Sequence, residues 1–222
     1  MIDLRRRERL LAVVLTGTAG FVDAVGFLEV GGYFVSFMSG NSTRMVVDLA
    51  GGRLGSAGVA AAVLVSFFVG AAAGAVVTRR QSLYDRPTVL SLVAALLLLA
   101  LGLQWLTDAT VAGLPVAMSV AAAAMGAMNS VFHSGGVVSL GVTYMTGAVV
   151  KAAHSLVDAL AGGSWAPYRH QVALWGSLAS GGVAGAALHV YWGSWALGVA
   201  ALVVLGALGV TVWLRRRALR TS

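Results

Sequence analysis

Residues 20–25 read Gly-Phe-Val-Asp-Ala-Val, and residues 126–131 read Gly-Ala-Met-Asn-Ser-Val. Each hexamer places one polar side chain, Asp23 or Asn129, inside a long apolar stretch. A second pair of segments follows: Val-Ser-Phe-Met-Ser-Gly in the first half and Val-Thr-Tyr-Met-Thr-Gly in the second, with one residue inserted. Apolar sequences align easily by chance, but an ordered series that includes polar residues indicates an internal repeat.

The composition is that of a membrane protein. Of the 222 residues, 59% are hydrophobic and 10% are charged, and the mean hydropathy is +0.87. A soluble domain typically carries about 25% charged residues. Lipid is therefore the expected surrounding of most of the chain.

Charge and cysteine content exclude several classes of function. The net charge of +7 comes from basic residues, all arginine except Lys151, that mostly flank apolar segments. This placement is typical of membrane orientation signals and does not indicate nucleic-acid binding. The chain has no cysteine, which excludes disulfides, thiolate metal sites and a cysteine nucleophile.

The length of the apolar stretches predicts six membrane spans, since a span needs about 20 residues. They cover residues 10–30, 57–77, 88–106, 111–131, 171–190 and 194–214. Two further segments, 33–50 and 138–160, are long enough to cross but contain glycine breaks and charges, so the sequence leaves crossing and re-entry open. The positive-inside rule favours six spans, because eight would move the arginines of residues 79–86 outside. Both termini are then cytoplasmic, in a bacterial cytoplasmic membrane.

Six spans make the repeat an inverted one. With three spans in each half, the second half enters the membrane from the opposite side, as in many transporter folds; eight spans would make the repeat parallel. The predicted fold is thus an all-α integral membrane domain over residues 1–222. Its six transmembrane helices form an inverted 3+3 repeat of residues 10–106 and 111–214, each half with a broken or re-entrant helix.

The two breaks are expected to meet. Re-entry from opposite sides would bring the N-termini of two short helices, with their free N–H groups, to one place near the midplane. Ser39 or Asn41 in the first half, and Thr146 in the second, would be the N-caps.

The first-half motif resembles the signature of a known family. Residues 20–28 (Gly-Phe-Val-Asp-Ala-Val-Gly-Phe-Leu) and residues 34–42 (Phe-Val-Ser-Phe-Met-Ser-Gly-Asn-Ser) are similar to those of the YoaK family. The resemblance covers essentially the whole chain. It implies a bacterial membrane protein of about six spans, of unknown function but with a role in transport, and it implies no substrate. The second half departs from the motif, with Asn129 in place of Asp23 and Ala148 in place of Asn41.

The predicted binding site consists of the polar residues and glycines of both breaks and the basic residue one turn beyond each. These residues are Asp23, Ser36, Ser39, Gly40, Asn41, Arg44, Asn129, Thr143, Thr146, Gly147 and Lys151. The hydroxyls, amides and backbone groups would contact a solute, or else would only kink or cap a crossing helix. Arg44 and Lys151 would hold an anionic solute, or else extend to opposite interfaces.

Asp23 is the sharpest candidate of this set. An ionisable residue within a span costs about 2.5–3.5 kcal/mol on insertion scales and so usually faces a cavity or a partner. It would bind a proton or a cation, or act as a gate; the alternative is a contact between helices, with Arg44 or Asn129 as partner. Glu29 and Asp48 are expected at solvated helix ends, and His189 has no metal-ligand spacing.

The predicted function is a secondary transporter or channel-like permease for a small solute or ion, with proton coupling as one option. The alternative is a non-transporting membrane scaffold or regulatory protein. An enzyme is not expected, because the P-loop, His-Glu-x-x-His and Gly-x-Ser-x-Gly motifs are absent. No cofactor is expected, the lipid bilayer is the expected partner, and a homo-oligomer is left open. Two Gly-x-x-x-Gly motifs, at 70–74 and 181–185, fit close helix packing within the chain or, less favoured, across a dimer.

Overall fold

The computed structural model describes residues 2–79, 86–107, 113–134, 137–138 and 143–220. The α-helices in these residues are α1 (Ile2–Glu29), α2 (Met38–Ala50), α3 (Leu54–Arg79), α4 (Arg86–Thr107), α5 (Gly113–Met128), α6 (Met145–Leu160), α7 (Ala166–Trp192) and α8 (Ala196–Arg220). Two 3₁₀ helices, η1 (Asn129–Phe132) and η2 (Gly193–Trp195), extend α5 and join α7 to α8. The strands β1 (His133–Ser134) and β2 (Val137–Val138) form one short antiparallel pair.

The chain is a multi-pass, predominantly α-helical membrane protein. Five helical segments of the described residues are long and apolar enough to cross a bilayer: Arg7–Glu29, Leu54–Arg79, Arg86–Leu106, Leu114–Phe132 and Ala166–Arg217. The last segment contains both α7 and α8, which separate at Gly193, where φ is +54°. A glycine tolerates this positive φ without a steric penalty. The long helices therefore coincide with the six predicted apolar stretches.

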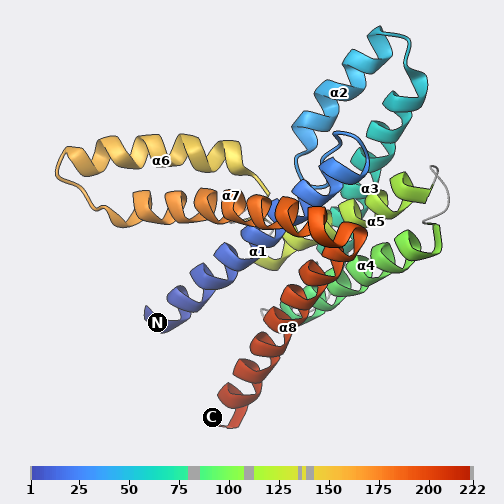
Figure 1. Ribbon diagram of the computed structural model, residues 1–222. Helices are drawn as coiled ribbons and strands as arrows, with labels where there is room; N and C mark the ends of the chain where they lie inside the picture. The colour runs from blue at the N-terminus through green and yellow to red at the C-terminus, as the bar shows by residue number, and fades with distance from the viewer. Residues whose placement is uncertain (1, 80–85, 108–112, 135–136, 139–142, 221–222) are drawn as a thin grey trace.

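Residues 33–50 and 138–160, for which the sequence left crossing and re-entry open, each contain a short helix. At 1.5 Å per residue, α2 is about 20 Å long and α6 about 24 Å, against about 30 Å of hydrocarbon. Figure 1 shows α2 packed beside α3 and α6 beside α7, as two hairpins that point in different directions. Residues 139–142, which belong to the second break, lie outside the described residues.

Helices α1 and α7 cross at glycines. A Cβ atom on Gly181 would collide with the backbone of Gly17, and one on Gly185 would collide with the backbone of Phe21. The two backbones approach this closely because the glycines carry no side chain, as is common where helices pack in lipid. The order of these contacts shows that α1 and α7 run in the same direction.

Helices α3 and α5 cross in the same way. A Cβ atom on Gly70 would collide with the backbone of Ala123, and one on Gly74 would press on the carbonyl of Ala127. These residues are the predicted repeat counterparts of those at the α1–α7 crossing. Both Gly-x-x-x-Gly motifs are thus used for packing within the chain, as the sequence favoured.

Helices α1 and α5 run in opposite directions. Near the end of α1, a Cβ atom on Gly26 would meet the sulfur of Met118, close to the start of α5. At the other end, the Arg86 guanidinium lies 2.7 Å from Glu8 in the first turns of α1 and 5.6 Å from the ring centre of Phe132, just beyond α5. Helices α4 and α8 pack against this pair and complete the core. Its largest fully buried side chains include Leu15, Val22, Leu90, Leu97, Met118, Met125 and Leu197.

Candidate functional site

The carboxylate of Asp23 holds the first break in place. Its Oδ1 accepts hydrogen bonds from the backbone N–H groups of Val35, at 2.7 Å, and Ser36, at 2.5 Å. Its Oδ2 accepts the Ser36 hydroxyl at 2.6 Å. Bonds to a charged acceptor are the strong kind. Asp23 lies six residues before Glu29, the last residue of α1, which is about 9 Å along the helix axis. Because Asp23 bonds Val35 and Ser36, the loop after α1 folds back by about this distance before α2 begins.

Asn41 fixes the same loop from the α2 side. Its side chain is fully buried, accepts the backbone N–H of Phe34 at 2.9 Å and donates to the carbonyl of Phe34 at 2.6 Å. The residue at the N-cap of α2 is Phe37, with no side-chain cap bond, so the predicted N-cap role of Ser39 or Asn41 is wrong. The side chain of Asn41 therefore forms hydrogen bonds with the backbone of the loop before α2 and not with the free N–H groups at the start of α2.

Ser39 and Gly40 lie in the first turn of α2. The Ser39 side chain is exposed, and its carbonyl accepts the hydroxyl of Thr43 at 3.1 Å. A Cβ atom on Gly40 would press on the rings of Phe37 and Phe34. The glycine therefore lets two aromatic rings fold over the start of the helix.

Arg44 forms hydrogen bonds with the backbone of the residues that follow α1. Its Nη1 donates to the carbonyls of Gly31 and Gly32, at 2.8 and 2.7 Å, and its guanidinium lies 3.9 Å from the ring centre of Tyr33. Its Nε is 3.7 Å from Asp48. Asp48 is buried and accepts a bond from Arg53 at 2.8 Å, so the expected solvated position for this carboxylate is wrong.

The second break repeats the first with weaker bonds. Asn129 Oδ1 accepts the backbone N–H and the hydroxyl of Thr143, at 3.4 and 3.3 Å, and its Nδ2 donates to the carbonyl of Met125. Asn129 and Thr143 are the predicted repeat counterparts of Asp23 and Ser36. The same pair of positions thus joins the end of the preceding long helix to the break in both halves.

The start of α6 also matches that of α2. The residue at its N-cap is Tyr144, with φ −90° and ψ 72°, against −90° and 75° for Phe37. No side-chain cap bond is made, so the predicted N-cap role of Thr146 is wrong. A Cβ atom on Gly147 would meet the Tyr144 ring, and Lys151 is exposed on α6.

The breaks lie toward opposite ends of the bundle. Asp23 is close to the end of α1 that meets the start of α5, whereas Asn129 is close to the end of α5 that meets Arg86 and Glu8. The eleven predicted site residues form two groups, one for each break. No hydrogen bond or ion pair among the described residues joins the two groups, and convergence of both short helices on one place stays a prediction.

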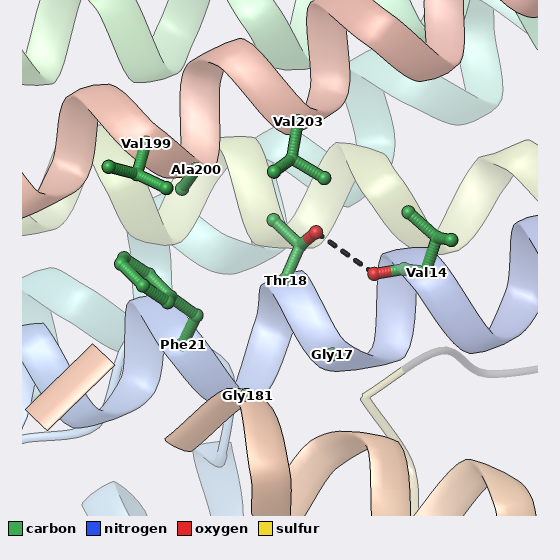
Figure 2. A pocket seen from close by; sticks show the side chains of 8 residues that line it. All are labelled: Val14, Gly17, Thr18, Phe21, Gly181, Val199, Ala200 and Val203. Atoms are coloured by element: carbon green, nitrogen blue, oxygen red, sulfur yellow. Dashed lines mark hydrogen bonds between the residues drawn. The ribbon is translucent and has the colours of Figure 1, made fainter. Parts of the chain in front are cut away.

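A cavity of about 190 Å³ lies between α1, α7 and α8. Figure 2 shows its lining: Val14, Gly17, Thr18, Phe21, Gly181, Val199, Ala200 and Val203. The Thr18 hydroxyl, its one polar side chain, donates to the carbonyl of Val14 at 2.9 Å. None of the predicted site residues lines the cavity. It depends on three helices from distant parts of the sequence, and sequence patterns carry no signal for that.

Comparison with known proteins identifies the family of the chain. A family model described as "Protein of unknown function (DUF1275)" matches residues 11–210. The chain belongs to this family. It is also similar to a UPF0700 transmembrane protein of Rhizobium meliloti (strain 1021), with 32% identity over 214 residues, which cover 92% of this chain and 87% of that protein. No solved structure matches the chain significantly.

Membership of the DUF1275 family confirms the predicted YoaK-like resemblance. The relative is named as a transmembrane protein, in agreement with the apolar helices of this chain. Neither description names a substrate or an activity, so the function of this DUF1275 chain must be argued from its own geometry.

One polar pair of this DUF1275 protein was missed by sequence reasoning. Glu29, at the end of α1, has a side chain only 9% exposed, and its Oε1 lies 3.4 Å from Nδ1 of His189 in the last turn of α7. The predicted solvated position of Glu29 is therefore wrong. The two residues are 160 positions apart, and only the α1–α7 crossing brings them together.

Proposed function

We propose that this DUF1275 protein is a secondary transporter or channel-like permease for a small solute or ion. In this proposal residues 10–106 and 111–214 form an inverted repeat of six spans in a bacterial cytoplasmic membrane, with both termini in the cytoplasm. One observation carries the proposal: two matching helix crossings have different surroundings, with a cavity beside the α1–α7 crossing and close packing beside the α3–α5 crossing.

The Glu8–Arg86 contact supports six spans. Glu8 lies at the start of the apolar segment of α1 and Arg86 follows α3, and the two side chains meet at one end of the bundle. The chain between these two residues must therefore cross the membrane an even number of times. The helices α1 and α3 give two crossings, so α2 must turn back without crossing. In the second half, Leu101 near the end of α4 contacts the Gly198 position near the start of α8. The helices α5 and α7 give the two crossings between these residues, so α6 must also turn back.

The difference between the two crossings supports alternating access. Helix α4 packs along α5, where Ala124 and Ala127 are fully buried, whereas α8 meets α1 over a shorter stretch. The α1 counterparts of these alanines are Thr18 and Phe21, on the side of α1 that faces α8 (Figure 2). In an inverted repeat, closing α8 onto α1 while α4 leaves α5 would move the opening to the other side.

The breaks have a defined place in such a mechanism. Asp23 with Ser36 and Asn129 with Thr143 lie at opposite ends of the bundle, where each would stand at one mouth of the pathway. The stronger bonds are those of the carboxylate. We therefore assign the Asp23 break as the tighter gate and the Asn129 break as the looser one.

Flux through purified protein in liposomes tests the proposal. The probes are protons, followed with a trapped pH-sensitive dye under a potassium potential set by valinomycin, and radiolabelled small carboxylates and amines. We expect Asp23→Asn and Gly40→Leu to reduce flux about tenfold or more, because both disturb the first break. Gly58→Leu is the matched control, since nothing lies within 4 Å of a Cβ atom there. Unaltered flux in both test variants would rule out the first break as part of the pathway.

A further inference from the structure

Glu29 and His189 form an ionisable pair at the last turns of α1 and α7, just before the first break. Their side chains are 9% and 20% exposed, and Glu29 Oε1 and His189 Nδ1 are 3.4 Å apart. Both atoms are buried and make no hydrogen bond of good geometry within the described residues. A buried carboxylate and a buried imidazole thus face each other with capacity for a further bond.

The helix crossing fixes where this pair lies. Helices α1 and α7 run in the same direction from the contact of Gly17 with Gly181, so their last turns come side by side. This end of the bundle is opposite the one that holds Glu8. The pair is therefore held by two long helices and not by a loop.

A second unpaired polar group lies at the same end. The side chain of Gln104 is fully buried, and neither its amide nitrogen nor its oxygen has a hydrogen-bond partner in the described residues. One turn earlier, Leu101 contacts the Gly198 position near the start of α8, and η2 joins α8 to the last turn of α7. A buried amide with free donors and acceptors is suited to bind water that leads to an ionisable pair.

Few other charged groups reach this end. Arg44 of α2 is bound to the carbonyls of Gly31 and Gly32, beside Tyr33, and Tyr191 is mostly exposed. The described parts of α4, α5, η2 and α8 at this end bring no titratable side chain. The charge on Glu29 is therefore balanced chiefly by whether His189 carries a proton.

The repeat does not require these polar groups. By the offsets that relate the two halves, the counterpart of His189 is Thr78 and that of Gln104 is Thr211, and each threonine bonds a carbonyl of its own helix. Unpaired buried ionisable groups are strongly unfavourable in a membrane and usually mark ion or proton pathways. The repeat counterparts of His189 and Gln104 thus satisfy their hydroxyls within their own helices, and the unpaired groups lie at one end of the bundle only, within the described residues.

We propose that Glu29 and His189 form a proton-binding site that couples proton movement to transport. Taking up one proton from water converts the neutral imidazole of His189 to a cation with hydrogen on both ring nitrogens, so that Nδ1 donates toward the Glu29 carboxylate, and releasing one proton to water restores the neutral imidazole. This inference rests on the proposed function for its coupling role. In this proposal the Glu29–His189 pair binds the proton, whereas the carboxylate of Asp23 has the structural role of bonding Val35 and Ser36 in the first break.

A double-mutant cycle tests proton binding without any flux measurement. Thermal unfolding of the detergent-purified protein is measured at pH 6 and pH 9 for wild type, Glu29→Gln, His189→Gln and the double variant. At pH 6 each single variant should unfold several degrees below wild type, and the double variant no lower than the worse single one. At pH 9 this coupling should disappear, because a neutral imidazole no longer attracts the carboxylate. Equal coupling at both pH values would overturn the proposal.

Two further measurements separate this site from its alternatives. In liposomes, Glu29→Gln and His189→Gln should each lower proton flux about tenfold, whereas Glu8→Gln, an exposed carboxylate on the same helix, should leave it unchanged. A coupling that follows sodium concentration and not pH would assign a metal cation and overturn the proton site. Absence of flux in wild type would contradict the proposed function, whereas pH-dependent coupling in the cycle would still support proton binding by the pair.

Discussion

The guanidinium of Arg86, at the start of α4, lies 2.7 Å from the carboxylate of Glu8, near the start of α1. A surface pair of this kind contributes little to stability, about 0–1 kcal/mol. It matters for topology, because it brings the ends of two helices together at one end of the bundle. In the proposed six-span arrangement this end lies on one side of the membrane and the start of α3, after α2, lies on the other side.

Cysteine labelling should reproduce this topology, and the natural chain offers a blank because it contains no cysteine. In whole cells, a membrane-impermeant maleimide should label Gly55→Cys, at the start of α3, where a side chain meets nothing within 4 Å. Gln81→Cys should react only after permeabilisation. Labelling of Gln81→Cys in intact cells would mean that α2 crosses, and the inverted repeat would be abandoned.

Asp23→Asn should destabilise the protein. The carboxylate accepts three hydrogen bonds from Val35 and Ser36, whereas an amide has one oxygen, carries no charge and would turn its NH₂ group toward the Ser36 hydroxyl or the two backbone N–H groups. The expected loss is about 1–3 kcal/mol in the free energy of unfolding. Thermal unfolding in detergent measures it.

Asn129→Asp is the matched reverse substitution. Both groups of Thr143 that face the amide oxygen are donors, but the second carboxylate oxygen would face the carbonyl of Met125, to which Nδ2 donates in the natural protein. Asn129→Asp should therefore also lower the unfolding temperature in detergent, and an unchanged temperature would show that Asn129 does not hold this break.

Gly181→Ala should weaken the α1–α7 crossing, since the added methyl collides with the backbone of Gly17. Overpacking of this kind costs about 1–3 kcal/mol. Gly176→Ala on the same helix meets nothing within 4 Å and should be neutral or gain up to about 1 kcal/mol, as alanine favours helix. If both variants unfold at the same temperature, the close crossing is not present in the protein in detergent.

Phe21→Ala should let α8 approach α1. The ring lies on the α8 side of α1, where the α5 counterpart is the buried Ala127. In a Thr18→Cys/Val203→Cys variant, oxidant-driven disulfide formation across the cavity should become faster when Phe21→Ala is added. The same addition should not change the Ala124→Cys/Leu96→Cys pair between α5 and α4. An unchanged rate across the cavity would show that Phe21 does not set the gap.

Much of the secondary structure could be predicted from local patterns. Apolar length gives the long helices, and the glycine at 193 separates α7 from α8 between the predicted spans 171–190 and 194–214. The alignment of Asp23 with Asn129 also predicted that both would occupy matching places, and both indeed bond the break that follows. These features depend on residues close together in sequence, whose preferences act before any helix packs.

The predicted N-caps failed. Asn41 bonds the loop of Phe34 and not the start of α2, and its fit depends on how that loop folds back along α1. The packing of the Gly-x-x-x-Gly motifs within the chain was predicted correctly, but the sequence did not say which helices they join.

The sequence by itself determined membrane residence, the long helices, the two breaks and the matching residues of the two halves, because hydropathy and helix interruption are local properties of the chain. Only the tertiary structure decided that Glu29 meets His189, that Gln104 is buried without a partner, and that a cavity opens beside Thr18. Those results follow from where α1, α7 and α8 cross. Crossings in lipid are set by the fit of small residues far apart in the sequence, since no hydrophobic force between helices selects them.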